Sequence, residues 1–363
     1  MLLLYCSILA GLAHSIGSAS AHPPWHWNHP LFKPGWSNTT EIPIQPRQEN
    51  TVAYLDGSVY LLGGIINQTL PGNPFGAITT SMVQAYDIKS RKWRSIAPLP
   101  TAINHGNAAV VGDKLYILGG LSLQGGNWIA DNNASYVYCS QTNSWRSLAP
   151  IPSQHSRGSA AVVTHGSKVY LAGGLRELDL FIGGKYTTID IVSVYNTETD
   201  TWSDAPAAAS RLPEGRDHVA SALVDDTFYV LGGRINATTV PNGGRRDTVF
   251  ALDLNDLEGG WSLKKGRMPT PRGGLSFGTF GRKVYTFGGE GNPEVESGVF
   301  NVTEVYDIDA DSWSTLQQMP LPVHGTYAAV KDGSIYIPGG GVHQNFGPTN
   351  VFQVYTPEQH WRW

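Results

Sequence analysis

Short hydrophobic runs of strand length recur along the whole chain, with polar turns between them. Six of these runs end in a glycine doublet, and successive doublets lie 56, 54, 59, 56 and 51 residues apart. Aliphatic and aromatic runs bounded by turn residues are typical of β-strands, and a fixed period of this length is typical of a repeat array. The pattern therefore predicts six similar all-β units. The doublets are Gly63-Gly64, Gly119-Gly120, Gly173-Gly174, Gly232-Gly233, Gly288-Gly289 and Gly339-Gly340.

A tyrosine and a tryptophan separated by six residues follow four of the doublets. The pairs are Tyr86 with Trp93, Tyr138 with Trp145, Tyr195 with Trp202 and Tyr306 with Trp313. A doublet, a Tyr and a Trp at matched offsets in a period of about fifty residues resemble the kelch repeat, in which each copy is one propeller blade. The resemblance implies an all-β, six-bladed kelch β-propeller with four-stranded blades, and we expect the Tyr and Trp rings to pack the blades.

The segment 36–46, which begins with Trp36, resembles the outer strand of the other repeats. We expect this N-terminal strand to complete the last blade, because joining both chain ends in one blade removes exposed strand edges. In the alternative, Trp361–Trp363 form that outer strand and Trp36 packs on the rim. The predicted organisation is a signal peptide over 1–21, an N-terminal arm over 22–35 and one propeller over 36–363.

The first 21 residues are mostly apolar and end in Ala19-Ser20-Ala21, which fits a signal-peptide cleavage site. They predict a secreted protein, either extracellular or in the lumen of the secretory pathway. Five Asn-x-Ser/Thr triplets agree with this location. All except the first fall in long connections after the doublets, so we expect glycans around one face. The triplets begin at Asn38, Asn67, Asn133, Asn236 and Asn301.

Charge and cysteine content exclude several classes of partner. The formal net charge is −4 and the basic residues are scattered, so we expect no nucleic acid and no anionic membrane as partners. No later hydrophobic run is long enough to span a bilayer. Cys139 is the one cysteine outside the predicted signal peptide, which leaves no intramolecular disulfide.

Binding residues are expected where the loops of all blades gather around the propeller axis, because loops on a rigid scaffold carry most binding sites. Alignment of the inner strands on the doublets assigns one residue per blade to this mouth. Since the last two are glycines, we expect a cleft that is open on the side of blades five and six. The aligned residues are Glu49, His105, Arg157, His218, Gly274 and Gly325.

Further polar and aromatic residues lie beside these positions or in the long loops that would roof the cleft. We expect small hydrophobic substrates to contact several of them, since a ligand pocket is mostly apolar with a few convergent polar groups. In the alternative interpretation, His105, Arg157 and His218 hydrogen-bond neighbouring blades, and Asp217 pairs locally with Arg216. The predicted substrate-binding residues are Glu49, Tyr327, Trp128, Phe75, Phe346 and His343, and Tyr186 is a further roof residue.

Some kelch propellers are copper radical oxidases, which need a Cys joined to a ligand Tyr and a Tyr-His pair. This chain has no Tyr-His dipeptide and no Glu-x3-Asp-x3-His run of the iron-dependent kelch specifier proteins. A copper site at the predicted new N-terminus, His22, is the remaining alternative. We therefore expect no metal and no cofactor.

In length, secretion, glycosylation pattern and predicted fold, the chain resembles secreted fungal hetero-Diels-Alderases of secondary metabolism. These join the quinone methide of a tropolone-type polyketide to a humulene-type terpene. The resemblance implies a metal-independent pericyclase, in which His105, His218 and His324 handle protons, with Asp217 beside them, and Arg157 or Arg272 holds a carbonyl oxygen. The alternative is a noncatalytic secreted propeller that binds a glycan or a protein through aromatic loop residues.

Overall fold

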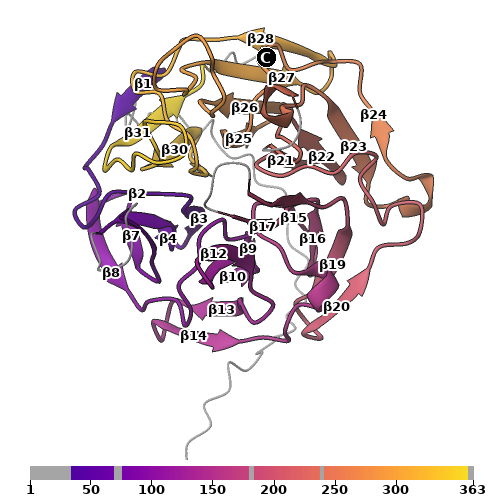
Figure 1. Ribbon diagram of the computed structural model, residues 1–363, viewed down its shortest axis with the longest axis horizontal. Coiled ribbons are helices and arrows are strands. Elements are labelled where there is room, and N and C mark those ends of the chain that lie inside the picture. The colour runs from indigo at the N-terminus through magenta and orange to yellow at the C-terminus, as the bar shows by residue number, and fades with distance from the viewer. Residues whose placement is uncertain (1–33, 69–75, 180–183, 238–240, 359–363) are drawn as a thin grey trace, which may run out of the picture. The chain divides into compact units, whose positions relative to one another are not determined.

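The hydrophobic runs form the strands of a ring of β-sheets in the computed structural model, which describes residues 34–358 except 69–75, 180–183 and 238–240. All of these residues belong to one compact unit, Phe32–Trp363. The predicted signal peptide, most of the N-terminal arm and Phe75 lie outside the described residues. Six sheets contain four antiparallel strands each and surround a common axis (Figure 1). These sheets are the blades.

The blades follow one another along the chain, and in the first five the chain runs from the innermost to the outermost strand. The first contains β3 (Thr51–Leu55), β4 (Ser58–Leu62), β7 (Val83–Asp87) and β8 (Lys92–Ile96), and the second β9 (Ala108–Val111), β10 (Lys114–Leu118), β13 (Ser135–Cys139) and β14 (Ser144–Ser147). The third contains β15 (Ala161–His165), β16 (Lys168–Ala172), β19 (Val192–Asn196) and β20 (Thr201–Asp204), and the fourth β21 (Ala220–Val224), β22 (Thr227–Leu231), β23 (Val249–Asp253) and β24 (Ser262–Leu263). The fifth contains β25 (Ser276–Phe280), β26 (Lys283–Phe287), β27 (Thr303–Asp307) and β28 (Ser312–Thr315), and the sixth β29 (Ala329–Lys331), β30 (Ser334–Pro338), β31 (Phe352–Thr356) and β1 (Gly35–Asn38).

Strand β1 closes the ring from the N-terminal side. It pairs antiparallel with β31, and Trp36 lies opposite Tyr355 in the register. The indole of Trp36 contacts the rings of Phe287 and Tyr355, at centroid distances of 5.4 and 5.0 Å. The predicted N-terminal closure is therefore confirmed, and the alternative that places Trp361–Trp363 in the outer strand is wrong, because β1 occupies that position.

Two further sheets are built from connections rather than blades. One contains β2 (Arg47–Gln48), β5 (Ile65–Asn67) and β6 (Ala77–Thr79), and the other β11 (Leu121–Gln124), β12 (Asn127–Ala130), β17 (Leu175–Leu178) and β18 (Tyr186–Thr188). β12 pairs with β17, which joins the connections of blades two and three. Three short 3-10 helices complete the described elements, η1 (Ser153–His155), η2 (Pro241–Gly244) and η3 (Leu257–Gly259). None of the helices in the described part of the chain could span a membrane.

The repeated tryptophans join neighbouring blades, as their fixed offset suggests. Each of five indole N–H groups donates to a backbone carbonyl of the adjacent blade or its connection, at 2.9 to 3.2 Å. The paired tyrosines are buried beneath these rings. The predicted packing role of the Tyr–Trp pairs is thus confirmed. The five donors are Trp36, Trp93, Trp145, Trp202 and Trp261.

A closed ring of backbone hydrogen bonds surrounds the axis. One residue just before each inner strand donates its N–H to the carbonyl of the corresponding residue in the preceding blade, at 2.5 to 3.2 Å, and the first blade donates to the sixth. All six residues have φ between 50° and 67°, a left-handed conformation that is unfavourable for residues other than glycine. The six are Glu49, His105, Ser159, His218, Gly274 and Gly325. We call this arrangement the axial ring.

The axial ring corrects the predicted alignment in blade three. The structure places Ser159 in the ring, whereas the sequence alignment chose Arg157. Ser159 lies fourteen residues before Gly173, the same spacing that separates Glu49 from Gly63. The uniform spacing is the sequence signal that identifies the ring position in every blade.

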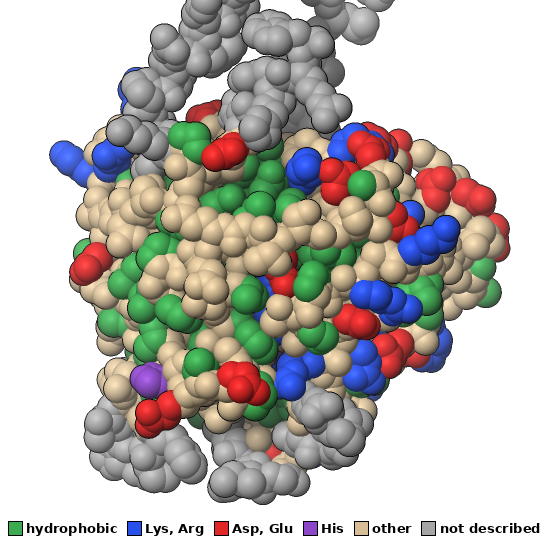
Figure 2. Space-filling view, turned by 90° about the horizontal axis from the view of Figure 1, so that it is seen from above, with side chains coloured by type: hydrophobic (Ala, Val, Ile, Leu, Met, Phe, Trp, Pro, Cys, Tyr) green, Lys and Arg blue, Asp and Glu red, His purple; other side chains and the backbone are tan. Residues whose placement is uncertain are grey.

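Among the predicted glycosylation sites, Asn38, Asn67 and Asn133 are exposed, and Asn236 and Asn301 are partly buried. On the face shown in Figure 2, acidic and basic side chains of the described residues lie interspersed rather than in patches of one sign.

Candidate functional site

Ionisable side chains from all six blades converge on the axis, on the face that carries the long connections. They come from the axial ring, from residues that precede inner strands, from residues that follow glycine doublets and from β18. All are largely buried, and the most exposed, the side chain of Arg234, is 14% accessible. We call this group the axial cluster: Glu49, His105, Tyr186, Asp217, His218, Arg234, Glu290 and His324.

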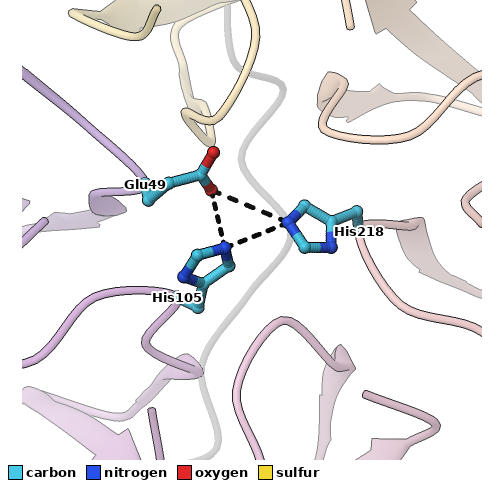
Figure 3. A group of neighbouring side chains, drawn as sticks. All are labelled: Glu49, His105 and His218. Atoms are coloured by element: carbon cyan, nitrogen blue, oxygen red, sulfur yellow. Dashed lines mark hydrogen bonds and ion pairs between the residues drawn. The ribbon is translucent and has the colours of Figure 1, made fainter. Parts of the chain in front are cut away.

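Two imidazoles and one carboxylate meet at the centre of the axial cluster (Figure 3). The Nε2 atoms of His105 and His218 lie 3.0 Å apart. Oε2 of Glu49 lies 3.1 Å from Nε2 of His105 and 3.8 Å from Nε2 of His218. The axial ring places these side chains, because it fixes the backbone of all three residues in the left-handed conformation that turns them inward.

The outer nitrogens of both imidazoles are held by oxygen atoms. Nδ1 of His105 lies 2.5 Å from Oδ1 of Asn104, and Nδ1 of His218 lies 2.5 Å from Oδ1 of Asp217. Tyr186 donates a further hydrogen bond to Asp217, at 2.6 Å. Burial raises the pKa of Asp217, but hydrogen bonding and charge from His218 and the charge of Arg234 lower it by more, so this side chain is a carboxylate. Burial and the neighbouring His218 hold the pKa of His105 well below its usual value.

Arg234 and Glu290 are members of the cluster that our sequence analysis did not identify. Arg234 donates from Nε to the hydroxyl of Tyr186 at 2.9 Å, forms an ion pair with Glu290 and approaches Nε2 of His218 to 3.2 Å. Burial raises the pKa of Glu290, whereas Arg234 and His324 lower it by more. Both residues directly follow a glycine doublet, where the first three blades have Ile or Leu. A charge at an otherwise apolar repeat position is the signal that could have identified them.

His324 lies at the edge of the cluster and has a free ring nitrogen. Its Nε2 donates to the backbone carbonyl of His343 at 2.8 Å. Its Nδ1 has no hydrogen-bond partner and lies 3.5 Å from Oε2 of Glu290 and 3.7 Å from Oε1 of Glu49. The predicted site residue His343 contributes its carbonyl to this contact, and its side chain is exposed.

The predicted open cleft on the side of blades five and six is wrong, because Glu49 extends into that space. A Cβ atom on Gly325 would lie 2.3 Å from Oε1 of Glu49, and one on Gly274 would lie 3.7 Å from the side chain of Glu290. Gly325 therefore makes room for the carboxylate of Glu49 instead of a ligand. The mouth is filled at the level of His105 and His218.

A hollow of about 170 Å³ lies on the axis beside the ring, between the inner strands. Thr51, Gly106, Ser221 and Tyr327 are among the residues that line it. Tyr327, predicted to bind substrate at the mouth, lines this hollow, where burial raises its pKa to about 12. A larger hollow of about 1700 Å³ lies away from the axis, along β26 and β27, and its charged residues include Lys283 and Asp307, which pair with each other.

Arg157 and Arg272 do not reach the mouth, so the catalytic roles predicted for them are wrong. Both side chains are buried within their own blades. Arg157 donates to the carbonyls of His155 and Leu171, at 2.7 and 2.8 Å. Burial lowers the pKa of both guanidinium groups. Arg157 is therefore structural, but its side chain bonds its own blade and not the neighbouring blades that the alternative named.

The alternative in which Asp217 pairs locally with Arg216 is not observed. Asp217 pairs with His218 and Arg234, whereas Arg216 pairs with Glu214. His105 and His218 bind neighbouring blades through their backbone atoms, and their imidazoles remain available to the cluster.

An apolar layer covers the cluster on the side of the connections. It contains Ile65, Leu121, Trp128, Leu175 and Tyr186, with Phe346 packed against them. Trp128 is 8% exposed, and its ring centroid lies 6.2 Å from that of His105. The predicted roof is therefore observed for Trp128, Tyr186 and Phe346, and it shields the cluster from water.

Comparisons with known proteins agree with this architecture. Residues 180–363 match the KLHDC2/KLHL20/DRC7 Kelch-repeats domain, and residues 46–100 match the Kelch motif. The Kelch-like protein terF of Aspergillus terreus is 35% identical over 89% of this chain and 68% of its own length. Alpha-scruin of Limulus polyphemus is 27% identical over 83% of this chain and 30% of its own length. The solved structure of YjhT superimposes with a TM-score of 0.67 at 18% identity, over 87% of this chain and 96% of that one. The chain belongs to the kelch-repeat family.

Proposed function

We propose that the protein is an enzyme that acts on small hydrophobic molecules at the loop-bearing mouth of the propeller. The axial cluster is the observation that carries this proposal. Burial of so many charged groups is energetically unfavourable unless each is well paired, and the backbone hydrogen bonds of the axial ring already join the blades at this level. Groups of interacting ionisable residues of this kind are typical of functional sites.

The proposed reaction is the hetero-Diels-Alder cycloaddition that the sequence resemblance implies. The fungal kelch-like relative from Aspergillus terreus supports the resemblance. A tropolone-type polyketide would first lose water: the ring hydroxyl gives up its proton, the leaving hydroxyl gains one, and a quinone methide forms. This would then add to an alkene of a humulene-type terpene, forming one C–C and one C–O bond. The sequence of steps consumes no oxidant and no reductant.

Among the three predicted acid–base histidines, the geometry favours His324. Its Nδ1 has no hydrogen-bond partner, whereas Nδ1 of His105 and Nδ1 of His218 are held by Asn104 and Asp217. The Nε2 atoms of these two imidazoles face each other and Glu49. A proton carrier needs a nitrogen that is free to exchange with the substrate. Arg234 takes the role predicted for Arg157 and Arg272, because it is the guanidinium of the cluster and can stabilise negative charge on a carbonyl oxygen.

The roof supplies an apolar surface for the reactants. Since the described side chains fill the mouth, substrate binding must displace roof residues, and Phe346 is only partly buried. Holding two apolar reactants in a reactive pose removes association entropy, an effect of up to about 7–11 kcal/mol in the best intramolecular cases. Trp128 is packed inside the roof rather than displayed on the surface, which disfavours a sugar-stacking platform.

The test is to incubate the purified protein with a hydroxymethyl tropolone and a humulene-type terpene, and to measure the rate of adduct formation and its enantiomeric excess. We expect a single stereoisomer above the spontaneous rate, and about a 100-fold slower reaction for His324→Gln. His165→Gln is the matched control, because His165 lies at the end of β15 remote from the axial ring and pairs with Asp226. A racemic product at the spontaneous rate would refute the proposal.

A further inference from the structure

Three atoms at the centre of the axial cluster point at one another without a positive charge between them. They are Oε2 of Glu49 and the two Nε2 atoms of His105 and His218, separated by 3.0, 3.1 and 3.8 Å (Figure 3). They come from three different blades and are all buried. A metal ion with three ligands of this kind would sit between them.

The hydrogen bonds at the far side of each imidazole determine where its proton lies. Asn104 donates from Nδ2 to Oγ1 of Thr79 at 2.8 Å, so its oxygen faces Nδ1 of His105. Asp217 accepts hydrogen bonds from the hydroxyls of Tyr186 and Thr188, so it also accepts from Nδ1 of His218. Both Nδ1 atoms therefore carry hydrogen, and in the neutral rings both Nε2 atoms present lone pairs.

Two lone pairs 3.0 Å apart, with a carboxylate oxygen beside them, repel one another. Nη2 of Arg234 can donate to Nε2 of His218 at 3.2 Å, while its Nε and Nη1 bind Tyr186 and Glu290. This contact relieves the repulsion at one of the three atoms only. A cation between the three atoms would turn the repulsion into coordination. The imidazoles are already oriented for this, because metal-bound histidines typically donate their other N–H to a carboxylate or a carbonyl oxygen.

A second observation is independent of the triad: Nδ1 of His324 is buried without a hydrogen-bond partner and faces Oε1 of Glu49, the oxygen that the triad does not use. This buried nitrogen therefore lies beside the triad and faces the carboxylate that would bind the cation.

We propose that Glu49, His105 and His218 form a binding site for one divalent transition-metal cation. Metal–nitrogen distances of about 2.0–2.1 Å and tetrahedral angles place ligand atoms about 3.3 Å apart, and the observed separations lie on both sides of that value. Two imidazoles and one carboxylate suit Zn²⁺, Co²⁺ or Fe²⁺ rather than Mg²⁺ or Ca²⁺, which prefer oxygen ligands. Three protein ligands leave one position open for water or a substrate oxygen.

The experiment titrates the full-length, chelator-treated protein with Zn²⁺ in a calorimeter, and with Co²⁺ while its visible absorption is recorded. We expect one equivalent of Zn²⁺ to bind, an absorption band typical of tetrahedral Co²⁺, and no comparable binding of Mg²⁺. Failure of the wild-type protein to bind Zn²⁺ would overturn the proposal, whatever the variants show.

Variants test whether the bound cation occupies this site. Glu49→Gln and His218→Asn should each weaken Zn²⁺ binding by at least about 100-fold, and Asn104→Ala, which frees the outer nitrogen of His105, by about 10–100-fold. Asn104 is a positioning residue, so its variant should also shift the Co²⁺ band. His165→Gln, which removes another carboxylate-paired imidazole, should bind like the wild type.

Unchanged Zn²⁺ affinity in the folded double variant Glu49→Gln/His218→Asn would place the cation elsewhere and refute the assignment. These measurements use no organic substrate. Their failure would leave the proposed cycloaddition standing, and an inactive but metal-loaded protein would refute only the proposed reaction.

Discussion

The replacement of Arg272 by methionine separates a structural role from a catalytic one. The Arg272 guanidinium is fully buried and pairs with Glu304, whose side chain is also buried. It further donates to the carbonyls of Gly288 and Thr270, at 2.6 and 2.8 Å. Methionine has a similar shape but leaves the carboxylate of Glu304 without its cation inside blade five.

Removing one partner of a buried ion pair typically costs about 3–5 kcal/mol. At about 2.1 cal/mol/K of unfolding entropy per residue, a ring of this size has about 0.7 kcal/mol/K, so we expect the midpoint of thermal unfolding to fall by about 4–7 °C. Glu304→Leu should cost a similar amount. The double variant should lose less than the sum of the two, by at least about 2 kcal/mol, because no unpaired charge then remains.

Differential scanning calorimetry on the three variants and the wild type measures these changes. Arg282→Met is the matched control, since Arg282 pairs with Asp309 at the surface and should cost less than about 1 kcal/mol. The reasoning fails if Arg272→Met unfolds at the wild-type temperature. If a folded Arg272→Met variant also lost the cycloaddition, Arg272 would act on a ligand, as the family resemblance implied.

Three more measurements test the fold and its environment. Burial raises the pKa of Asp311, but the Tyr306 hydroxyl and the N–H of Gly266 lower it by more. The stabilising effect of the Asp311 carboxylate is therefore present above about pH 4 and fades as the pH falls further. In urea melts, the difference in unfolding free energy between the wild type and Asp311→Asn should shrink below that pH. Trp36→Ala should destabilise the protein by about 3 kcal/mol, and Trp36→Phe by clearly less, because phenylalanine keeps the ring contact with Tyr355. Equal losses of unfolding free energy in urea titrations would argue against ring packing as the cause. Secreted protein should begin at His22 and lose mass on treatment with an N-glycosidase, as checked by intact mass spectrometry; an unprocessed, unglycosylated chain would contradict secretion.

The blades could be predicted because their signals repeat. The doublets mark the end of each second strand, and a Cβ atom on Gly63 would lie 2.3 Å from the carbonyl of Ile103 in the next blade, so only glycine fits there. The sheet of β11, β12, β17 and β18 could not be predicted, because it pairs connections of different blades that share no period.

The site was predicted only in part. The alignment identified Glu49, His105 and His218 because the residue fourteen positions before the doublet always turns toward the axis. It could not show that the glutamate reaches across Gly325, because a repeat pattern fixes the position of a backbone but not the direction of a long side chain. Nor could it show that Arg234 pairs with Glu290, since that contact crosses between blades.

The axial ring has a consequence for how such a propeller can change. Its six hydrogen bonds use only main-chain atoms, so the side chains at these positions can be exchanged without loss of these bonds. The six positions surround one small volume on the axis. A new set of six residues would give a different chemistry at the centre while the neighbouring blades kept their attachment, provided that each newcomer tolerates a positive φ. Glutamate, histidine, serine and glycine occupy these six ring positions here, and asparagine or aspartate would also tolerate the backbone conformation.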